Sequence, residues 1–151
     1  MGGAFTAPSL RHSESFRLPS FCSIFSAESI AILQAISYIS SLSDLSQFLI
    51  ISDTNGVLQA TSSPPSHSSD SIILSIRSLT STLQSSRSIL IDFLWVPSHS
   101  GIDGNDAADS LARSAGRLDS FLNHFPSSDI LSLSTSNHAR LWQDNLSLSI
   151  F

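Results

Sequence analysis

The chain has 151 residues, of which 41% are hydrophobic, and a formal net charge of −5 at neutral pH. This is the size of one domain with a tail, with enough apolar residues for a modest core. All seven basic residues are arginine, which excludes a broad lysine-rich surface for gripping phosphates. The single Cys22 excludes an internal disulfide and a cysteine-rich zinc module. The N-terminus lacks the long apolar region of a signal peptide, and no uncharged apolar run of about 18 residues occurs, so we expect an intracellular chain, nuclear or cytoplasmic, with no membrane contact.

The first third of the chain alternates short apolar runs with polar residues. Residues 3–5 and 20–25 predict two strands joined by the polar segment between them. Residues 27–40 show near-helical apolar spacing, which predicts a helix with Ser26 as its N-cap and Glu28 in its first turn. The run QFLIISD, residues 47–53, is continuously apolar until Asp53, as in a strand buried on both faces, and a short helix or turn follows it.

The rest of the chain repeats this alternation and then changes character. A proline- and serine-rich loop at 62–69 precedes a segment in which Ile72, Ile76, Leu79 and Leu83 recur at helical spacing. ILIDFLWV at 89–96 predicts a second buried strand. A helix is expected at 104–116, with Gly116 as its C-cap. We expect one mixed α/β domain over residues 1–116 and an accessory tail over 117–151, in which Leu141 and Trp142 pack a small amphipathic helix onto the domain.

Four polar residues stand at places where chemistry is common, and each also has an ordinary explanation. Asp53 and His99 follow strands, where open sheets bind ligands, but they fit a turn cap and a solvated loop equally well. Glu28 could complement a helix dipole, and Asp109 could pair with Arg113 one turn later. The residue types alone leave these alternatives open.

Three segments around these residues resemble a known family in their order and spacing. FSAESIAILQAI, LIISDTNGVLQA and WVPSHSGIDGNDAADSLAR resemble the second, third and fourth motif blocks of type 1 ribonuclease H, in the version carried by non-LTR retrotransposon reverse transcriptase polyproteins. The likeness covers residues 2–115, and the last block is the most specific. It implies a ribonuclease H-like mixed sheet with flanking helices. It also implies an enzyme that cleaves the RNA strand of an RNA–DNA hybrid as part of a larger polyprotein.

The resemblance also implies a metal site. Glu28, Asp53 and Asp109 would be ligands of two Mg²⁺ ions, with Mn²⁺ as a substitute, because hard divalent cations prefer oxygen ligands. His99, on its loop, would assist proton transfer or product release near the scissile phosphate.

Three amides would then face the nucleic acid. Asn105 would contact the hybrid or steady the loop before the last helix. Asn55 and Gln59 would donate hydrogen bonds in the minor groove of the hybrid, where 2′-hydroxyls mark the RNA strand.

The sequence departs from the family at its beginning. The family starts with a central strand that carries a metal-bridging aspartate in an Asp-Gly-Ser turn, whereas residues 2–5 here resemble its second strand and no aspartate precedes Glu28. We therefore expect a sheet without its first, central strand, in which residues 47–53 expose an unpaired edge. Three hypotheses follow: a ribonuclease H domain impaired by the absent aspartate, a non-catalytic remnant that binds nucleic acid weakly, or a serine-rich protein whose acids are surface caps.

Overall fold

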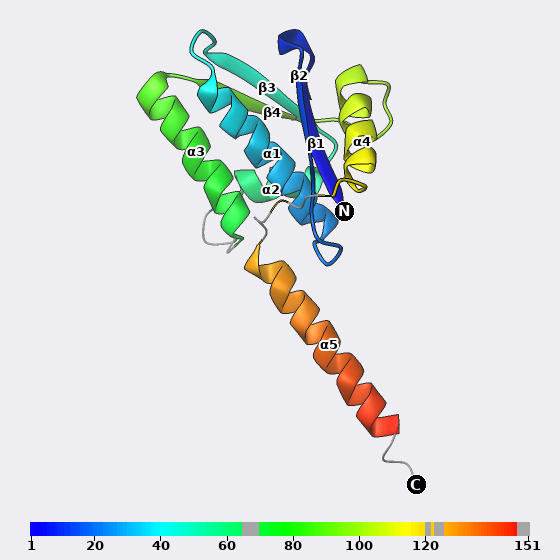
Figure 1. The fold of residues 1–151 in the computed structure, drawn as a ribbon. Coiled ribbons are helices and arrows are strands. Elements are labelled where there is room, and N and C mark those ends of the chain that lie inside the picture. The colour runs from blue at the N-terminus through cyan, green and yellow to red at the C-terminus, as the bar shows by residue number, and fades with distance from the viewer. Residues whose placement is uncertain (65–69, 120–121, 123–125, 148–151) are drawn as a thin grey trace.

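The computed structural model describes residues 1–64, 70–119, 122 and 126–147 as a mixed α/β domain followed by a long helix (Figure 1). Its elements, in chain order, are β1 (Gly2–Ala7), a 3-10 turn η1 (Pro8–Leu10), β2 (His12–Arg17), α1 (Ile24–Ser41), β3 (Gln47–Ser52), α2 (Asn55–Ser62), α3 (Ser71–Arg87), β4 (Leu90–Trp95), α4 (Asp103–Ala115) and α5 (Ser127–Ser147). The predicted fold class, a mixed sheet with flanking helices, is confirmed.

The strands form two separate pairs. β1 and β2 are antiparallel, from Gly2 opposite Arg17 to Ala7 opposite His12. β3 and β4 are parallel, from Gln47 opposite Leu90 to Ser52 opposite Trp95. Within the part of the chain that the structure describes, no strand joins the two pairs, so β1 and β3 each keep one edge without a strand partner. The expected gap in the sheet is therefore present.

Helix α1 is the centre of the domain. It packs against α3 on one side and β1 on the other, while α4 covers the opposite face of β1 (Figure 1). Successive residues of β1 face opposite sides of the strand, and the first two are glycines. A Cβ on Gly2 would lie 2.1 Å from the Ala112 carbonyl oxygen of α4, and one on Gly3 would lie 2.4 Å from the Phe16 ring. Two glycines therefore allow the close approach of neighbours on both faces.

The core is aliphatic and centres on α1 and α3. Its fully buried apolar side chains are Leu18, Ile30, Ile36, Val57, Ile72, Ile73, Ile76 and Ile89. By length and composition α1 could cross a membrane, but Ile30 and Ile36 are completely buried within this core. Core packing accounts for the apolar character of α1.

The predicted start of α1 and the predicted second strand are wrong. Residues 20–25 form a turn and the beginning of α1, and the second strand is instead the polar segment His12–Arg17. The N-cap is Ser23, not Ser26: the Ser23 hydroxyl accepts a hydrogen bond from the backbone N–H of Ser26 at 3.1 Å. Glu28 consequently lies beyond the first turn, so the helix dipole does not explain its position.

The prediction that the two parallel strands are buried on both faces is also wrong. In β3, Phe48 and Ile50 pack against the core, whereas Leu49 and Ile51 are 56% and 40% exposed. In β4, Leu90, Leu94 and Trp95 are exposed in the same way. Helices cover one face of this strand pair, and the other face is open.

The remaining helices follow the predicted order. α3 begins at Asp70, whose carboxylate accepts hydrogen bonds from the N–H groups of Ile72 and Ile73 at 2.9 and 3.3 Å. Most of the predicted loop at 62–69 lies outside the described residues. α4 matches the predicted helix, although Gly116 after it has a right-handed conformation (φ −57°) rather than that of a left-handed cap.

The tail docks through its first turn and then leaves the domain. Asp129 of α5 is buried beside Cys22, and burial first, then the charge of Asp129, raises the pKa of the thiol to about 11. Beyond this turn α5 extends away from the domain (Figure 1). The side chains of Leu141 and Trp142, expected to pack on the domain, lie outside the described residues.

Candidate active site

Three elements bring three carboxylates to one end of a groove. The groove has a volume of about 1040 Å³ and is lined by residues of β1, α1, β3 and α4. Glu28 enters it from α1, Asp53 follows the last residue of β3, and Asp109 enters it from α4. The structure therefore unites the three acids that sequence reasoning selected.

The pKa of Glu28 responds to the charges of the other two acids. Its side chain is half-buried, and its pKa is raised from 4.5 to about 7, first by desolvation and then by the negative charges of Asp53 and Asp109. A raised carboxyl pKa of this origin is typical of clustered acids that lack a compensating cation. Glu28 is thus partly protonated near neutral pH.

Asp53 is held by the loop that follows β4. The Ser98 hydroxyl donates a hydrogen bond to Asp53 Oδ2 at 2.5 Å, and Trp95 Nε1 donates to the Asp53 carbonyl oxygen at 3.1 Å. The residue at the N-cap of α2 is Thr54, and no side chain caps that helix. The ordinary explanation of Asp53 as a turn cap therefore does not describe its side chain.

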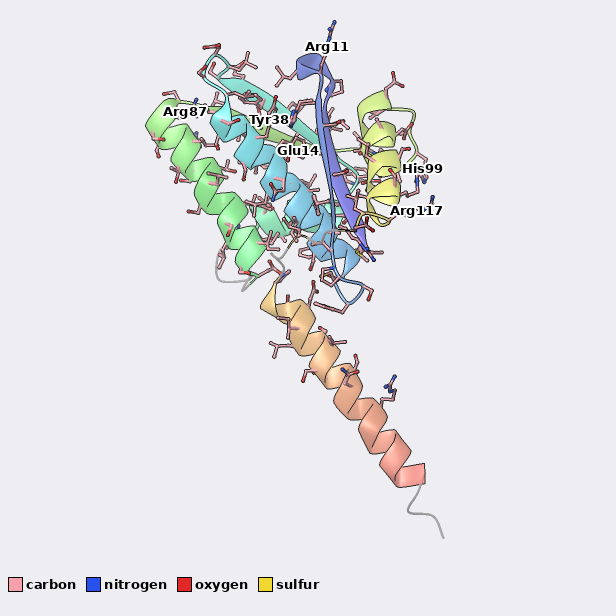
Figure 2. All side chains as sticks on the ribbon, viewed as in Figure 1. Arg11, Glu14, Tyr38, Arg87, His99 and Arg117 are labelled. Carbon is pink, nitrogen blue, oxygen red and sulfur yellow. The ribbon has the colours of Figure 1, made fainter. Side chains whose placement is uncertain are left out.

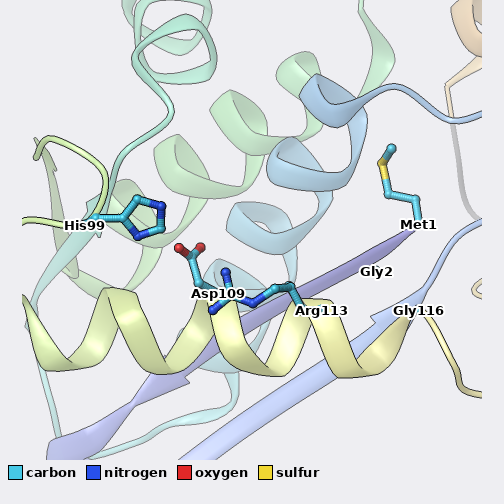
Figure 3. Close-up of a pocket in the computed structure, with 7 residues that line it drawn as sticks. Met1, Gly2, His99, Asp109, Arg113 and Gly116 are labelled. Atoms are coloured by element: carbon cyan, nitrogen blue, oxygen red, sulfur yellow. The ribbon is translucent and has the colours of Figure 1, made fainter.

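His99 lies on the other side of Asp109. It lines a smaller pocket of about 430 Å³ together with Gly2, Asp109 and Arg113, and its ring points toward Asp109 (Figure 3). The backbone of His99 is left-handed (φ 56°), a strained conformation in an exposed loop. The suggested ion pair between Asp109 and Arg113 is not formed, since the described residues contain a single ion pair, His12 with Glu14.

The three amides expected to face nucleic acid are divided between two places. Asn105 lines the groove, and its Nδ2 is buried without a hydrogen-bond partner. Asn55 and Gln59 are exposed on α2, where Gln59 Nε2 donates to Asn55 Oδ1 at 3.1 Å, and they do not line the groove. Only Asn105 is therefore brought together with the carboxylates.

The carboxylates have suitable chemistry for a divalent cation, but their arrangement is incomplete. Carboxylate oxygens are the ligands that Mg²⁺ and Mn²⁺ prefer. In the part of the chain that the structure describes, however, no group of three His, Cys, Asp or Glu side chains is close enough to hold a metal ion. The residues present do not by themselves form a finished metal site.

Sequence reasoning did not identify Ser98 and Trp95 as site residues. Both contacts join residues more than 40 positions apart, which only the parallel pairing of β3 and β4 brings together. Their sequence signal is a polar residue three positions after an indole at the end of a strand, and this is too common to indicate a site.

A mixed α/β domain with clustered carboxylates at a strand end belongs to a class that includes metal-dependent hydrolases of phosphate esters. Residues 2–117 match the family model of RNase H, and the chain belongs to the ribonuclease H family. This family acts on RNA–DNA hybrids and generally uses divalent metals. No curated protein matches the chain.

Proposed function

We propose that this chain is the ribonuclease H domain of a retrotransposon reverse transcriptase polyprotein, and that its site acts on the RNA strand of RNA–DNA hybrids. The observation that carries the proposal is the convergence of Glu28, Asp53 and Asp109 at one end of a single groove. Three acids contributed by separate elements are not expected from surface capping, because caps lie at the ends of their own helices.

In this proposal Glu28, Asp53 and Asp109 are the residues that would hold divalent cations, Mg²⁺ or Mn²⁺, of which the family uses two. When bound, such cations would supply positive charge that offsets the negative charge developed during phosphodiester hydrolysis. The raised pKa of Glu28 supports this assignment, because a cation would relieve the repulsion that Asp53 and Asp109 exert on it.

His99 and Asn105 act on the substrate around the carboxylates. An imidazole can accept and release a proton near neutral pH, and the exposed His99 is placed to do so beside Asp109. Asn105 offers a buried amide with unused donors to a phosphate or a base edge. Asn55 and Gln59 extend the contact surface along α2, where they reach the minor groove of the hybrid.

The chain alone is expected to bind better than it cuts. The three carboxylates lack the spacing of a finished metal site in the described part of the chain. The same observation favours the second candidate function, a non-catalytic remnant that binds hybrid weakly through Asn105, Asn55 and its arginines. The two candidates differ in whether binding requires a divalent ion.

The test measures Mn²⁺ affinity and hybrid binding of the unmodified chain, Asp53→Asn and the control Asp92→Asn. Asp92 is an exposed acid of β4 that does not line the groove. Losing a ligand should weaken Mn²⁺ binding by at least about tenfold in Asp53→Asn, because even the loss of a partner behind a ligand costs about 10- to 100-fold, and Asp92→Asn should leave it unchanged. Equal Mn²⁺ affinity in all three proteins contradicts the metal site, and hybrid binding that is unaltered by chelation supports the remnant.

A further inference from the structure

One face of the β3 and β4 pair, turned away from the core, exposes large apolar side chains. Those on this open face, each at least 40% exposed, are Leu49, Ile51, Leu90 and Leu94. The two that belong to β4 do not line the groove that holds the carboxylates. Apolar side chains gathered on one face of a folded domain mark an interaction surface.

Asp92 lies in the middle of the open face. Alternation along β4 places it on the same side of the strand as Leu90 and Leu94, and strand pairing sets it opposite Leu49. Its side chain is exposed, and no residue in the described part of the chain forms an ion pair with it. The face therefore offers one negative charge flanked by apolar side chains, and a complementary partner carries one positive charge within an apolar surface.

Helix α5 carries this complementary pattern. Ile130, Leu131 and Leu133 are exposed, although helices in proteins gain most of their stability from packing an apolar face. Arg140 is exposed seven residues after Leu133, which places the two side chains on the same face of the helix two turns apart. Arg140 has no ion-pair partner among the described residues either.

The spacing of charge and apolar side chains is similar on the two surfaces. Leu133 and Arg140 are about 10 Å apart along the axis of α5. Asp92 and Leu94 are roughly 7 Å apart along β4, and the long, flexible arginine side chain can cover the difference. Leu133 can therefore pack beside Leu94 while Arg140 reaches Asp92.

The start of α5 keeps the helix away from the open face of its own domain. Pro126, just before the helix, is fully buried, and Asp129 in its first turn is buried beside Cys22. From this anchor α5 extends away from the domain (Figure 1). It could fold back onto its own strands only by withdrawing these buried residues, whereas a second copy offers the same face without that loss.

We propose that the open face of β3 and β4 is a dimer interface that receives α5 of a second copy of this chain. The partner's Arg140 pairs with Asp92, and the apolar side chains of its helix cover the leucines beside Asp92. In a closed dimer the exchange is reciprocal, so each copy gives one α5 and receives one. Dimerisation through α5 requires neither metal nor nucleic acid, so it is independent of whether the carboxylate site cuts RNA.

Sedimentation velocity of the full chain, without metal or nucleic acid, measures this association. Asp92→Arg and Arg140→Asp should each weaken the dimer about tenfold or more, because each substitution brings like charges together. Asp103→Arg makes the same charge change at an exposed acid of α4 and should dimerise as the unmodified chain does. An unmodified chain that stays monomeric at about 100 μM contradicts the interface.

Mixing the two weakened variants distinguishes a second copy from a contact within one chain. In an equimolar mixture of Asp92→Arg and Arg140→Asp, both contacts of a reciprocal dimer join opposite charges, so a heterodimer should form. A contact within one chain is restored only when both substitutions are combined in the same protein. Recovery in the combined protein alone, or in neither sample, overturns the proposal.

Amide hydrogen exchange of the unmodified chain tests the interface without any substitution. Protection of the α5 amides should rise with protein concentration as the helix docks on its partner. Protection of α5 that is the same at all protein concentrations overturns the proposal, even if a variant fails to fold by circular dichroism.

Discussion

Glu28 is the residue at which the chemistry of the site is most visible. It belongs to the interior of α1 rather than to a cap, and burial, followed by the charges of Asp53 and Asp109, raises its pKa. A carboxyl group with a raised pKa in the folded state binds its proton more tightly than in the unfolded chain. Its contribution to stability is therefore complete below pH 4.5 and is lost as the pH rises toward about 7.

We predict that Glu28→Gln removes this pH dependence. One pKa unit corresponds to about 1.4 kcal/mol, and discounting the shift for solvent screening at a half-buried side chain leaves about 1–2 kcal/mol. Urea unfolding at about pH 4.5 and about pH 8 should show the unmodified chain losing that much more stability than Glu28→Gln. Mg²⁺ should restore the loss in the unmodified chain only, and parallel pH profiles for the two proteins would disprove the coupling.

The chain has few cations, and several of its arginines bind backbone carbonyl groups at the ends of helices. Arg77 donates to the carbonyl oxygens of Ala60, Thr61 and Ser63 at the end of α2, and Arg87 donates to those of Ser40 and Leu42 at the end of α1. Arg11, by contrast, lies at the turn between β1 and β2, and Arg117 lies beside α4 (Figure 2). Two of the arginines therefore bind helix ends, which leaves fewer cations to attract the phosphates of nucleic acid.

At the scale of elements, the central contact is between β1 and α4. Gly2 faces the backbone of α4 so closely that a side chain has no space, with the Ala112 carbonyl oxygen 2.1 Å and the Gly116 nitrogen 2.8 Å from the position of a Cβ. Both neighbours are backbone atoms, which cannot rotate away. This contact holds the part of α4 that carries Asp109, one turn before Ala112, against the groove.

We predict that Gly2→Ala pushes α4 away from β1 and lowers the free energy of unfolding by about 1–3 kcal/mol. The matched control is Gly56→Ala in α2, where the nearest atom to a Cβ is 3.9 Å away and alanine should be neutral or gain up to about 1 kcal/mol. Thermal unfolding of both variants measures the difference. Equal stability of the two would show that α4 can shift without cost.

Elements with strong apolar periodicity could be predicted from the sequence, and those defined by polar residues could not. The helices α3 and α4 and both parallel strands have regular or continuous apolar patterns, and they lie close to their predicted places. β2 was missed because HSESFR carries little apolar signal, and its pairing with β1 supplies what its sequence lacks. The start of α1 was misplaced because Ser20, Ser23 and Ser26 are equivalent as caps until the fold selects one.

In the site, too, some features could be predicted from local sequence patterns and others depend on how the strands pair. Glu28, Asp53 and Asp109 could be selected because their family motifs are local in the sequence. Their spacing depends on the sheet, and so does the hydrogen bond between Ser98 and Asp53. The exposed faces of β3 and β4 could not be foreseen either, because continuous apolar runs do not reveal which face a helix covers.

At the scale of the whole molecule, the interrupted sheet links the fold to the site. The gap between β1 and β3, the exposed Leu49 and Ile51, and the three incompletely arranged acids occur at the same groove. A strand in the gap would pair both edges and reach the carboxylates. We therefore predict that activity is limited by the gap in the sheet rather than by the three acids already present.

The most direct test is cleavage of a labelled RNA–DNA hybrid in Mg²⁺ by the chain as it stands and by a version with a strand ending in Asp-Gly-Ser joined before Gly2. The extended protein should cut the RNA at least roughly a hundredfold faster, and Asp53→Asn in that background should abolish cutting. Equal cleavage by the two proteins would show that three carboxylates suffice and would contradict the account. A folded extended protein that cuts no RNA would contradict the proposed function itself.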